Sequence, residues 1–544
     1  MKATGTFFIF IFLSFSSLMA ETNVNVIIPK PQMFQLLEGR FIITAQTHYS
    51  TQTPLASNAI DYLQQQLQVN ADYTIKKAET SPDDVISYKL DHTLKEEAYT
   101  LQITSQVIVI KSNSQSGFFY ATMSLMQLMD ARIWTLQKSK NPQKSWTVPA
   151  CYVEDSPRFK WRGMMLDSSR NFFSVAYVKK FIDRMAQHKL NVFHWHLTDD
   201  EGWRIEIKKY PLLTKVGAKR GPGTKLPFSL YPAMRGPKDK MQEGYYTQDD
   251  IREIVAYAAK RSVNILPEID VPAHAKAAVT AYPELLQDPK DKSRYTSVQK
   301  VDNNTMDAGL ESTYLFLENI IEEVVTLFPF EYIHLGGDEI PKGAWQKSPA
   351  VAKLMQKEHL KETKEVQAYF FAKMDKVLAK HNRKMIAWQE VRKHNSALRD
   401  STIIMAWRSD GAGIKAAKNG HKVIMSPAQY LYFDQQYVKS KEEPGHTWAG
   451  PTDTKEVYSY RPVSNRLSVK QAHNIQGVHG TLWSETALDE QIADYLAWPR
   501  MFALSEIAWS TKKQKNRADF EVRAFGEGLK RLDSQKIQYR QPSE

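Results

Sequence analysis

Hydrophobic and polar positions follow two different patterns along this chain. Before about residue 155, short apolar runs such as Val107–Ile110 are mixed with helical stretches at 57–68 and 117–130. After Pro157, apolar runs of strand length alternate with amphipathic helical patterns. Such alternation is typical of parallel βα units. The chain is therefore expected to form a small α/β domain followed by a larger α/β domain.

Eight strand-like runs lie in the second part of the chain, and eight is the number of strands in a (β/α)8 TIM barrel. They span 161–167, 190–198, 263–269, 331–336, 384–388, 402–407, 421–426 and 475–483. Helical patterns occur at 175–188, 248–261, 310–327, 361–380, 411–418 and 489–508. The irregular stretch 200–247 is expected to be an active-site loop. We predict an accessory α/β domain over 21–155, the barrel over 156–512 and a C-terminal helical extension over 513–544.

Residues 1–20 combine Lys2 with an apolar run from Phe7 to Met19 that ends at Ala20. A run of this length is too short to span a bilayer and is typical of a signal peptide. We expect export to the periplasm or the medium, and no integral membrane segment after the signal is removed. Cys151 is the only cysteine, so no intramolecular disulfide can form.

The formal net charge of +12 raises the question of an anionic partner. Lys and Arg are spread along the chain without a basic block, which argues against a nucleic-acid-binding protein. Weak adhesion to an anionic cell envelope is equally compatible with this charge.

Chemistry in a barrel of this kind is located where strands end. The predicted strand ends carry Asp199-Asp200, His274, Asp338-Glu339, Trp388, Trp407, Tyr432 with Asp434, and Trp483 with Glu485, while Arg162 lies within the first strand. Aromatic faces combined with planar polar groups are typical of a sugar-binding site.

Asp338 and Glu339 are adjacent and follow two glycines, which let a ligand approach the backbone closely. A retaining glycosidase usually places its acid and its nucleophile on two carboxylates roughly 5 to 5.5 Å apart across the sugar. Adjacent residues cannot easily straddle a bond in this way. One of the two carboxylates must have a different task.

The His194-Trp195-His196 segment supports an alternative, because a His-x-His pair on a barrel strand can hold the metal of an amidohydrolase. The later strand ends offer tryptophans rather than further ligands, so we expect no metal and no other cofactor. A carbohydrate-binding protein without catalysis is a second alternative. The adjacent carboxylates argue against it, because a lectin gains nothing from a buried acid.

Three segments carry motifs: Trp161–Arg170 (WRGMMLDSSR), His194–Arg204 (HWHLTDDEGWR) and His334–Glu339 (HLGGDE). Together they resemble glycoside hydrolase family 20, the β-N-acetylhexosaminidases, and the likeness covers nearly all of the chain after the signal peptide. The resemblance implies a bacterial exo-acting enzyme that removes terminal β-linked N-acetylglucosamine, or N-acetylgalactosamine, from chitooligosaccharides or glycans. It also implies a retaining mechanism in which the substrate's own acetamide is the nucleophile.

The resemblance assigns a role to each candidate residue. Glu339 is expected to protonate the leaving oxygen, Asp338 to hold the acetamide N–H, and Tyr432 to donate to the acetamide oxygen. The remaining expectations are a relay of His274 and Asp199 behind Glu339, sugar hydroxyls held by Arg162, Asp434 and Glu485, an acetamide box of Trp388, Trp407 and Trp483, and Trp448 as a platform for the next sugar. Ala273 stands where the family often has glycine, and Tyr432 is chosen over Tyr430 by its spacing to Asp434.

Overall fold

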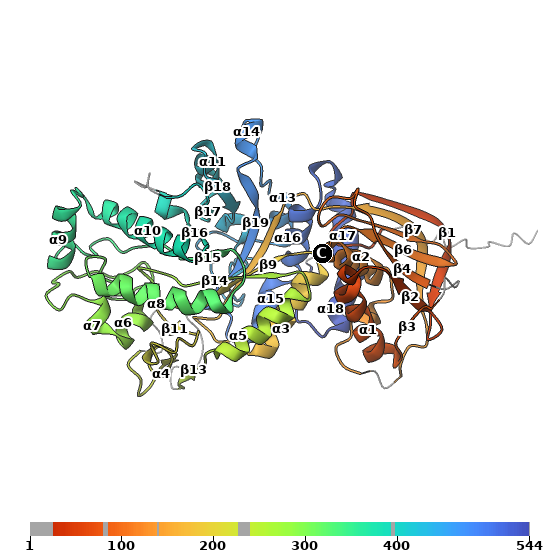
Figure 1. The fold of residues 1–544 in the computed structure, drawn as a ribbon, viewed down its shortest axis with the longest axis horizontal. Helices are drawn as coiled ribbons and strands as arrows, with labels where there is room; N and C mark the ends of the chain where they lie inside the picture. Colours follow the sequence, from red (N-terminus) through yellow and green to blue (C-terminus); the bar gives the residue numbers. More distant parts are fainter. Residues whose placement is uncertain (1–24, 80–84, 139–140, 227–239, 393–397, 543–544) are drawn as a thin grey trace, which may run out of the picture.

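The computed structural model describes residues 25–79, 85–138, 141–226, 240–392 and 398–542. The expected signal peptide, residues 1–20, lies outside the described residues. The chain forms an eight-stranded parallel barrel preceded by a mixed α/β domain, as the sequence pattern predicts (Figure 1).

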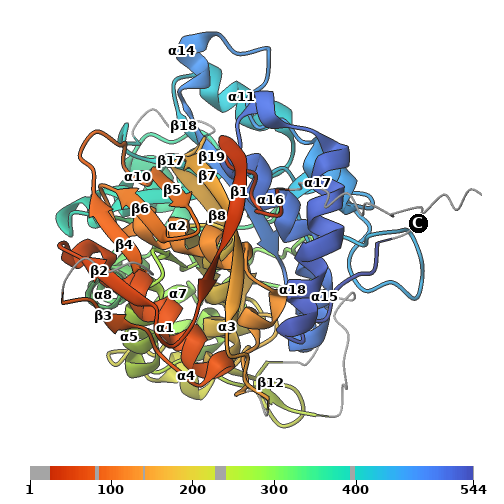
Figure 2. The same cartoon turned by 90° about the vertical axis from the view of Figure 1, so that its right-hand side faces the viewer.

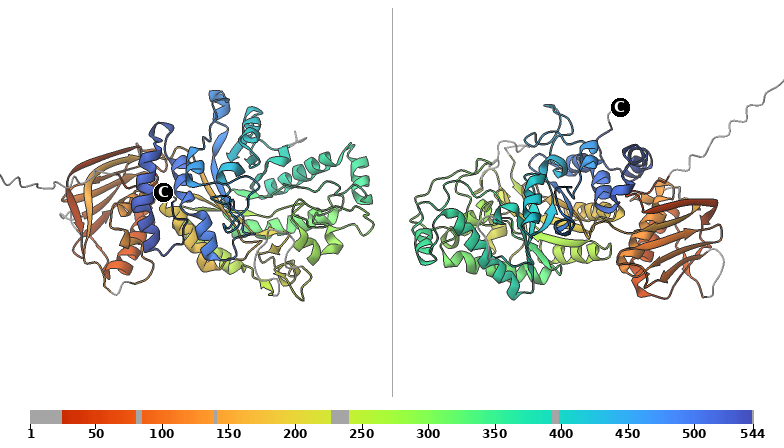
Figure 3. Two further views of the ribbon diagram at one scale, coloured as in Figure 1. Left: turned by 180° about the vertical axis from the view of Figure 1, so that it is seen from behind. Right: turned by 90° about the horizontal axis from the view of Figure 1, so that it is seen from above.

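The N-terminal domain is a seven-stranded sheet in the order β1-β7-β5-β6-β4-β2-β3. Its strands are β1 (Met33–Ile43), β2 (His48–Thr51), β3 (Lys76–Lys77), β4 (Val85–Leu90), β5 (Tyr99–Ile103), β6 (Val107–Ser112) and β7 (Trp146–Asp155). Helices α1 (Ser57–Ala71) and α2 (Gln115–Gln127) cover the face of the sheet that is turned toward the barrel (Figure 3). Nearly every residue of α2 is buried, because the helix lies between the sheet and the barrel.

The barrel closes through parallel pairs in the order β8-β9-β14-β15-β16-β17-β18-β19. Its strands are β8 (Trp161–Asp167), β9 (Val192–His196), β14 (Asn264–Glu268), β15 (Tyr332–His334), β16 (Lys384–Trp388), β17 (Ile403–Ala406), β18 (Lys422–Met425) and β19 (Ile475–Leu482). The longer helices around it are α3 (Val175–Gln187), α5 (Gln248–Ala259), α8 (Glu311–Leu327), α9 (Pro349–Lys357), α10 (Thr363–Lys380), α11 (Asp410–Lys418), α15 (Glu490–Ala497) and α16 (Arg500–Trp509).

Two of the expected elements differ in detail. The helix expected over 489–508 is divided into α15 and α16 at Pro499, whose ring removes a backbone donor. The connection from β18 to β19 holds only the short helices α12 (Ala428–Leu431), α13 (Thr454–Ser459) and α14 (Val469–Ala472). Among the described residues, no helix is long and apolar enough to cross a bilayer.

The C-terminal helices α17 (Arg517–Arg523) and α18 (Leu529–Ser534) lie where the barrel meets the N-terminal domain (Figure 2). Arg523 forms an ion pair of 2.7 Å with Glu506 of α16, and Arg531 donates to Oε1 of Gln127 at 3.1 Å. A buried ion pair of 2.8 Å between Lys189 and Asp155 joins the same two bodies. The two domains are thus fastened to each other at the end of the barrel where its strands begin.

Candidate active site

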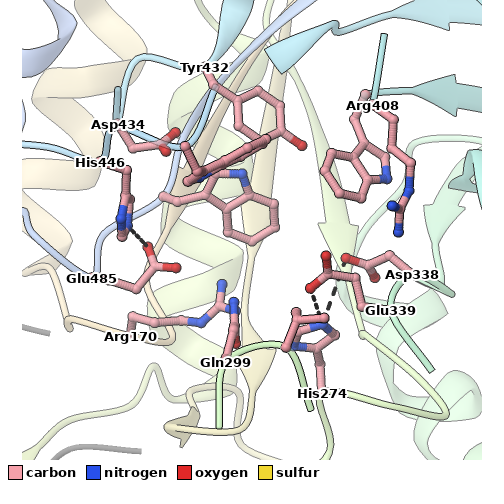
Figure 4. Close-up of a pocket in the computed structure, with 14 residues that line it drawn as sticks. Arg170, His274, Gln299, Asp338, Glu339, Arg408, Tyr432, Asp434, His446 and Glu485 are labelled. Atoms are coloured by element: carbon pink, nitrogen blue, oxygen red, sulfur yellow. Dashed lines mark hydrogen bonds and ion pairs between the residues drawn. The ribbon is translucent and has the colours of Figure 1, made fainter. Parts of the chain in front are cut away.

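A cavity of about 410 Å³ lies at the carboxyl ends of the barrel strands. Nine of the twelve residues expected from the sequence line it: His274, Asp338, Glu339, Trp407, Tyr432, Asp434, Trp448, Trp483 and Glu485. Arg170, Val298, Gln299, Arg408 and His446 complete the wall (Figure 4). The arrangement gathers residues from at least five strand ends into one polar and aromatic pocket.

The turn after β15 places Asp338 and Glu339 in this pocket. Gly336 has a φ of +61°, and a Cβ built on it would lie 1.6 Å from Oδ1 of Asp270. The same Asp270 oxygen accepts a hydrogen bond of 3.2 Å from the backbone N–H of Gly337. Only glycine fits this close approach, and it turns the next two side chains inward.

His274 lies under both carboxylates (Figure 4). Its Nε2 is 3.7 Å from Oε2 of Glu339 and 3.8 Å from Oδ2 of Asp338, while its Nδ1 is 3.0 Å from Oδ1 of Asp199. Burial lowers the pKa of His274, but the charges of Asp199 and Asp338 outweigh it and raise the pKa well above its usual value. Asp199 does not line the pocket; it supports the histidine from behind.

The chain of contacts continues below Asp199. His196 lies 2.9 Å from Asp199 through Nε2 and 2.5 Å from Glu268 through Nδ1. Oε1 of Glu268 receives the Nε1–H of Trp388 at 2.9 Å and lies 2.8 Å from Nδ1 of His334. Burial opposes ionisation of Glu268, yet the surrounding histidines hold its pKa well below the usual range.

The histidines of the metal alternative belong to this buried network. Ligand atoms of His194, Glu268 and His334 lie within 4.8 Å of one another, a spacing that could accept an ion. Both oxygens of Glu268, however, already have nitrogen partners, including Nε2 of His194 at 3.0 Å. The three side chains thus lie within pairing distance of one another, and Nε2 of His334 has no hydrogen-bond partner among the described residues.

Asp338 and Tyr432 occupy complementary electrostatic positions. Burial and the charge of Glu339 raise the pKa of Asp338 to about 7, although His274 acts in the opposite direction. Burial and the charges of Asp434 and Asp338 raise the pKa of Tyr432 well above its usual value, so its hydroxyl remains a donor. The ring of Tyr432 lies 6.2 Å from that of Trp407, nearly parallel to it.

Arg170, Asp434 and Glu485 form the wall opposite the Asp338–Glu339 pair (Figure 4). Burial raises the pKa of Asp434 to about 7, whereas the charge of Arg170 overcomes the burial of Glu485 and lowers its pKa to about 2. Oε2 of Glu485 lies 3.6 Å from Nε2 of His446. Oδ1 of Asp434 and, across the pocket, Oδ1 of Asp338 accept no hydrogen bond from the described residues. Buried acceptors of this kind are suited to the O–H and N–H groups of a ligand.

Arg162 is not in the pocket, and its assignment to sugar hydroxyls is wrong. It is the second residue of β8 and lies at the opposite end of the barrel. Its guanidinium pairs with Glu97 of the N-terminal domain at 2.7 Å and donates to the hydroxyl of Tyr120 at 3.1 Å. Arg162 therefore fastens the two domains together.

Arg170 is the arginine of the same motif that reaches the pocket, and the sequence reasoning missed it. It follows the carboxyl end of β8, where Asp167 accepts its backbone N–H at 3.1 Å. Its side chain is held by Asp199 at 2.7 Å and by Glu201 at 3.0 Å. These carboxylates fix the guanidinium beside the ring of Trp483, 4.9 Å from its centroid.

Three of the expected tryptophans line the pocket, and the fourth is buried behind them. Trp407, Trp448 and Trp483 line the pocket, and Trp448 is 53% exposed. Trp388 is fully buried and packs behind Trp483 with ring centroids 6.0 Å apart. Two of the three expected indoles, Trp407 and Trp483, thus line the pocket, whereas Nε1 of Trp388 is bound to Glu268 and its ring packs behind Trp483.

Comparison with known proteins agrees with this architecture over both domains. Residues 159–512 match "Glycosyl hydrolase family 20, catalytic domain", and residues 25–156 match "Glycosyl hydrolase family 20, domain 2". A β-hexosaminidase of Vibrio furnissii is 37% identical over 89% of this chain and 77% of its own length. One from Porphyromonas gingivalis is 35% identical over 96% of this chain, which spans 65% of that relative.

Solved structures give the same result. The exo-β-N-acetylglucosaminidase of Vibrio harveyi, in complex with N-acetylglucosamine, superposes with a TM-score of 0.88 and 35% identity over 96% of this chain and 79% of its own. The β-N-acetylhexosaminidase of Bacteroides fragilis has a TM-score of 0.79 and 32% identity over 95% of this chain and 97% of its own. The chain therefore belongs to glycosyl hydrolase family 20, the family of the β-hexosaminidases.

Proposed function

We propose that this glycoside hydrolase releases terminal β-linked N-acetylhexosamine by a retaining, substrate-assisted mechanism. The observation that carries the proposal is the adjacent pair Asp338 and Glu339, with both carboxylates about equally far from Nε2 of His274. Both acids stand on one side of the pocket, so they are poorly placed to act as acid and nucleophile across a glycosidic bond. A nucleophile supplied by the substrate removes this difficulty.

In the first step Glu339 donates a proton to the glycosidic oxygen, and the bond from that oxygen to the anomeric carbon breaks. The carbonyl oxygen of the acetamide forms a bond to the same carbon and gives an oxazolinium ion. Asp338 accepts a hydrogen bond from the acetamide N–H and stabilises its positive charge, while Tyr432 donates to the acetamide oxygen. In the second step water attacks the anomeric carbon, the bond from that carbon to the acetamide oxygen breaks, and Glu339 takes the proton of the water. The acetamide is restored and the configuration is retained.

The wall formed by Arg170, Asp434 and Glu485 supports a proposal for which sugar the enzyme binds. Asp434, whose Oδ1 accepts no hydrogen bond from the described residues, and Glu485 can accept hydrogen bonds from sugar hydroxyls, and Arg170 can donate to the oxygens of these hydroxyls. The Vibrio harveyi relative, an exo-β-N-acetylglucosaminidase, was solved with N-acetylglucosamine. We infer terminal N-acetylglucosamine of chitooligosaccharides or glycans as the substrate, with N-acetylgalactosamine as a second possibility, and we retain the proposal that the enzyme is exported.

The proposal is tested by assaying gluco- and galacto-configured aryl N-acetylhexosaminides beside the same glycosides without the acetyl group. Hydrolysis restricted to the acetylated pair supports acetamide participation, and the ratio within that pair gives the sugar preference. A thiazoline that imitates the oxazolinium should inhibit strongly, because it resembles the charged intermediate. Equal hydrolysis of the non-acetylated glycosides would contradict the proposal.

A further inference from the structure

Six basic side chains surround a second cavity of about 410 Å³, which shares no lining residue with the active site. We call it the cationic pocket. Its walls come from α13, from the last turn of α16, and from the segment that leads into α17. The six side chains are Arg158, Lys455, Arg461, Lys512, Lys515 and Arg517.

These positive charges have little compensation. The one acidic residue in the lining is Glu506, and both of its oxygens are taken by Arg523, at 2.8 and 2.7 Å. Arg517 pairs with Glu521 at 3.6 Å on the surface. Within the described part of the chain, the other five basic side chains form no ion pair with a carboxylate.

Two of these five side chains, Lys515 and Arg158, are partly buried, so water solvates their charges less well. Nζ of Lys515 donates to the carbonyl oxygens of Ser459 and Tyr460, at 3.2 and 2.9 Å. Burial, and then the charges of Arg461 and Arg158, lower the pKa of Lys515 to about 8. The guanidinium of Arg158 lies 4.6 Å from the ring centroid of Phe159. The cavity therefore concentrates positive potential that the fold does not neutralise.

The six basic side chains are not explained by a role in neutralising the negative ends of helices. Carbonyl groups at the carboxyl end of a helix attract cations, and Lys515 serves the end of α13 in this way. Within the described residues, Lys455, Arg461 and Lys512 make no side-chain hydrogen bond to such a carbonyl. A bound anion would explain why these three basic side chains line the same cavity.

We propose that the cationic pocket binds an oxyanion, namely a phosphate or sulfate group. Arginine and lysine bind such groups through charge-assisted hydrogen bonds, and arginine can do so with two parallel N–H donors. Tyr458 and Tyr460 also line the cavity and can contact the remainder of a larger ligand. The group can belong to a free inorganic ion or to a sulfated or phosphorylated saccharide, since both present the same chemistry.

The test uses the full chain at constant ionic strength. Binding of inorganic phosphate, inorganic sulfate and a sulfated disaccharide is measured by calorimetry, with chloride as the reference anion. We expect one saturable site per chain. Tighter binding of the inorganic ions identifies a free ion as the ligand, whereas tighter binding of the disaccharide identifies a saccharide-borne group.

Lys455→Gln/Arg461→Gln is the decisive variant, because both side chains are exposed and removing them leaves no buried charge. It should weaken oxyanion binding about tenfold or more, since a hydrogen bond to a charged group contributes enough for such a factor. Hydrolysis of an aryl N-acetylglucosaminide should remain at the wild-type rate, which also shows that the variant is folded. Lys290→Gln/Lys292→Gln, which removes two exposed charges elsewhere, is the control and should bind like wild type.

Two results would overturn the proposal. One is the absence of saturable binding of any of the three oxyanions above the chloride reference. The other is equal binding by the wild type and by Lys455→Gln/Arg461→Gln, because the site would then lie elsewhere. If Lys290→Gln/Lys292→Gln weakens oxyanion binding equally, the loss follows from net charge rather than from the cationic pocket, and the proposal is likewise overturned.

Discussion

Nδ1 of His274 lies 3.0 Å from Oδ1 of Asp199, and this contact turns the opposite ring nitrogen toward Glu339. Asp199 is in turn held by Arg170 at 2.7 Å and by His196 at 2.9 Å. Asp199 thus raises the pKa of the histidine beneath the Asp338–Glu339 pair, although it does not line the pocket. We infer that Asp199 is a positioning residue for the proposed reaction.

Replacement of Asp199 by Asn should lower kcat/KM by about 10²-fold at pH 7. Asp199 raises the pKa of His274, so the imidazolium persists to higher pH in the wild type. Without that charge His274 loses its proton at lower pH, and the basic limb of the kcat/KM profile should move in the acid direction. The measurement is the pH profile of kcat/KM for the wild type and for Asp199→Asn with the same aryl glycoside. A lower kcat/KM with an unchanged basic limb would show that Asp199 has a structural role only.

Arg170 and Arg162 offer a matched comparison, because they stand at opposite ends of the same barrel strand. Arg170→Met should lower kcat/KM by at least about 10²-fold, since several hydrogen bonds to charged groups are lost at the sugar. Arg162→Met should destabilise the fold by roughly 3–5 kcal/mol, because Glu97 loses its buried partner, but it should leave kcat/KM of the folded protein nearly unchanged.

For both arginine variants, the thermal midpoint and the kcat/KM of the folded fraction are measured side by side. The folded fraction of Arg162→Met should retain activity close to that of the wild type. Loss of catalysis without loss of stability in Arg162→Met would reverse the assignment made from the structure.

The pKa of Asp338, raised to about 7 by burial and by Glu339, predicts an acid limb in the activity profile. Ionised Asp338 is the form that accepts a hydrogen bond from the acetamide N–H, so kcat/KM should fall as the pH drops through about 7. Asp338→Asn should be slower by about 10²- to 10³-fold, as expected for the loss of a group that stabilises transition-state charge. It should also lack this limb, and its persistence in the variant would show that another group titrates.

Trp448 predicts a dependence on substrate length. Trp448 is 53% exposed, and its ring meets the ring of Trp407 edge to face at 6.1 Å. Trp448→Ala should lower kcat/KM for a chitotriose by up to about tenfold, because a stacked aromatic contact is lost. An aryl monosaccharide glycoside should be hydrolysed nearly as before, and Trp448→Phe should restore most of the loss. Equal effects on both substrates would remove the role of Trp448 as a platform.

Chelation distinguishes the hydrogen-bonded histidine network from a metal centre. Both oxygens of Glu268 already have nitrogen partners, so activity should be unchanged after exhaustive treatment with a chelator. The measurement is kcat/KM before and after treatment, with the metal content of the protein determined in parallel. If activity is lost on chelation and returns when zinc is added, His194 and His196 would instead be metal ligands.

The barrel could be predicted from the sequence because its strands are buried on both faces and are mostly apolar along their length. The rule that chemistry follows strand ends identified the positions of Glu339, Trp407 and Trp483. The same rule, applied strictly, would have favoured Arg170 over Arg162, since Arg170 follows the carboxyl end of β8 and Arg162 lies near its beginning.

Other parts of the site depend on tertiary packing that no local pattern reveals. Gln299 and His446 reach the pocket from loops, and their neighbours in the sequence carry no periodic signal. Trp388 ends its strand as expected, but the partner of its Nε1 is Glu268 on β14, which draws the ring behind Trp483. Such contacts are decided by which strands lie side by side.

The central claim is that the acetamide oxygen of the substrate forms the first new bond. Its most direct test is a series of aryl glycosides whose acetyl group carries zero, one, two and three fluorine atoms. Fluorine withdraws electrons and weakens the carbonyl oxygen as a nucleophile, so log kcat/KM should fall steadily with each atom added. Rates that do not depend on the number of fluorine atoms would contradict participation of the acetamide and would require a nucleophile from the protein.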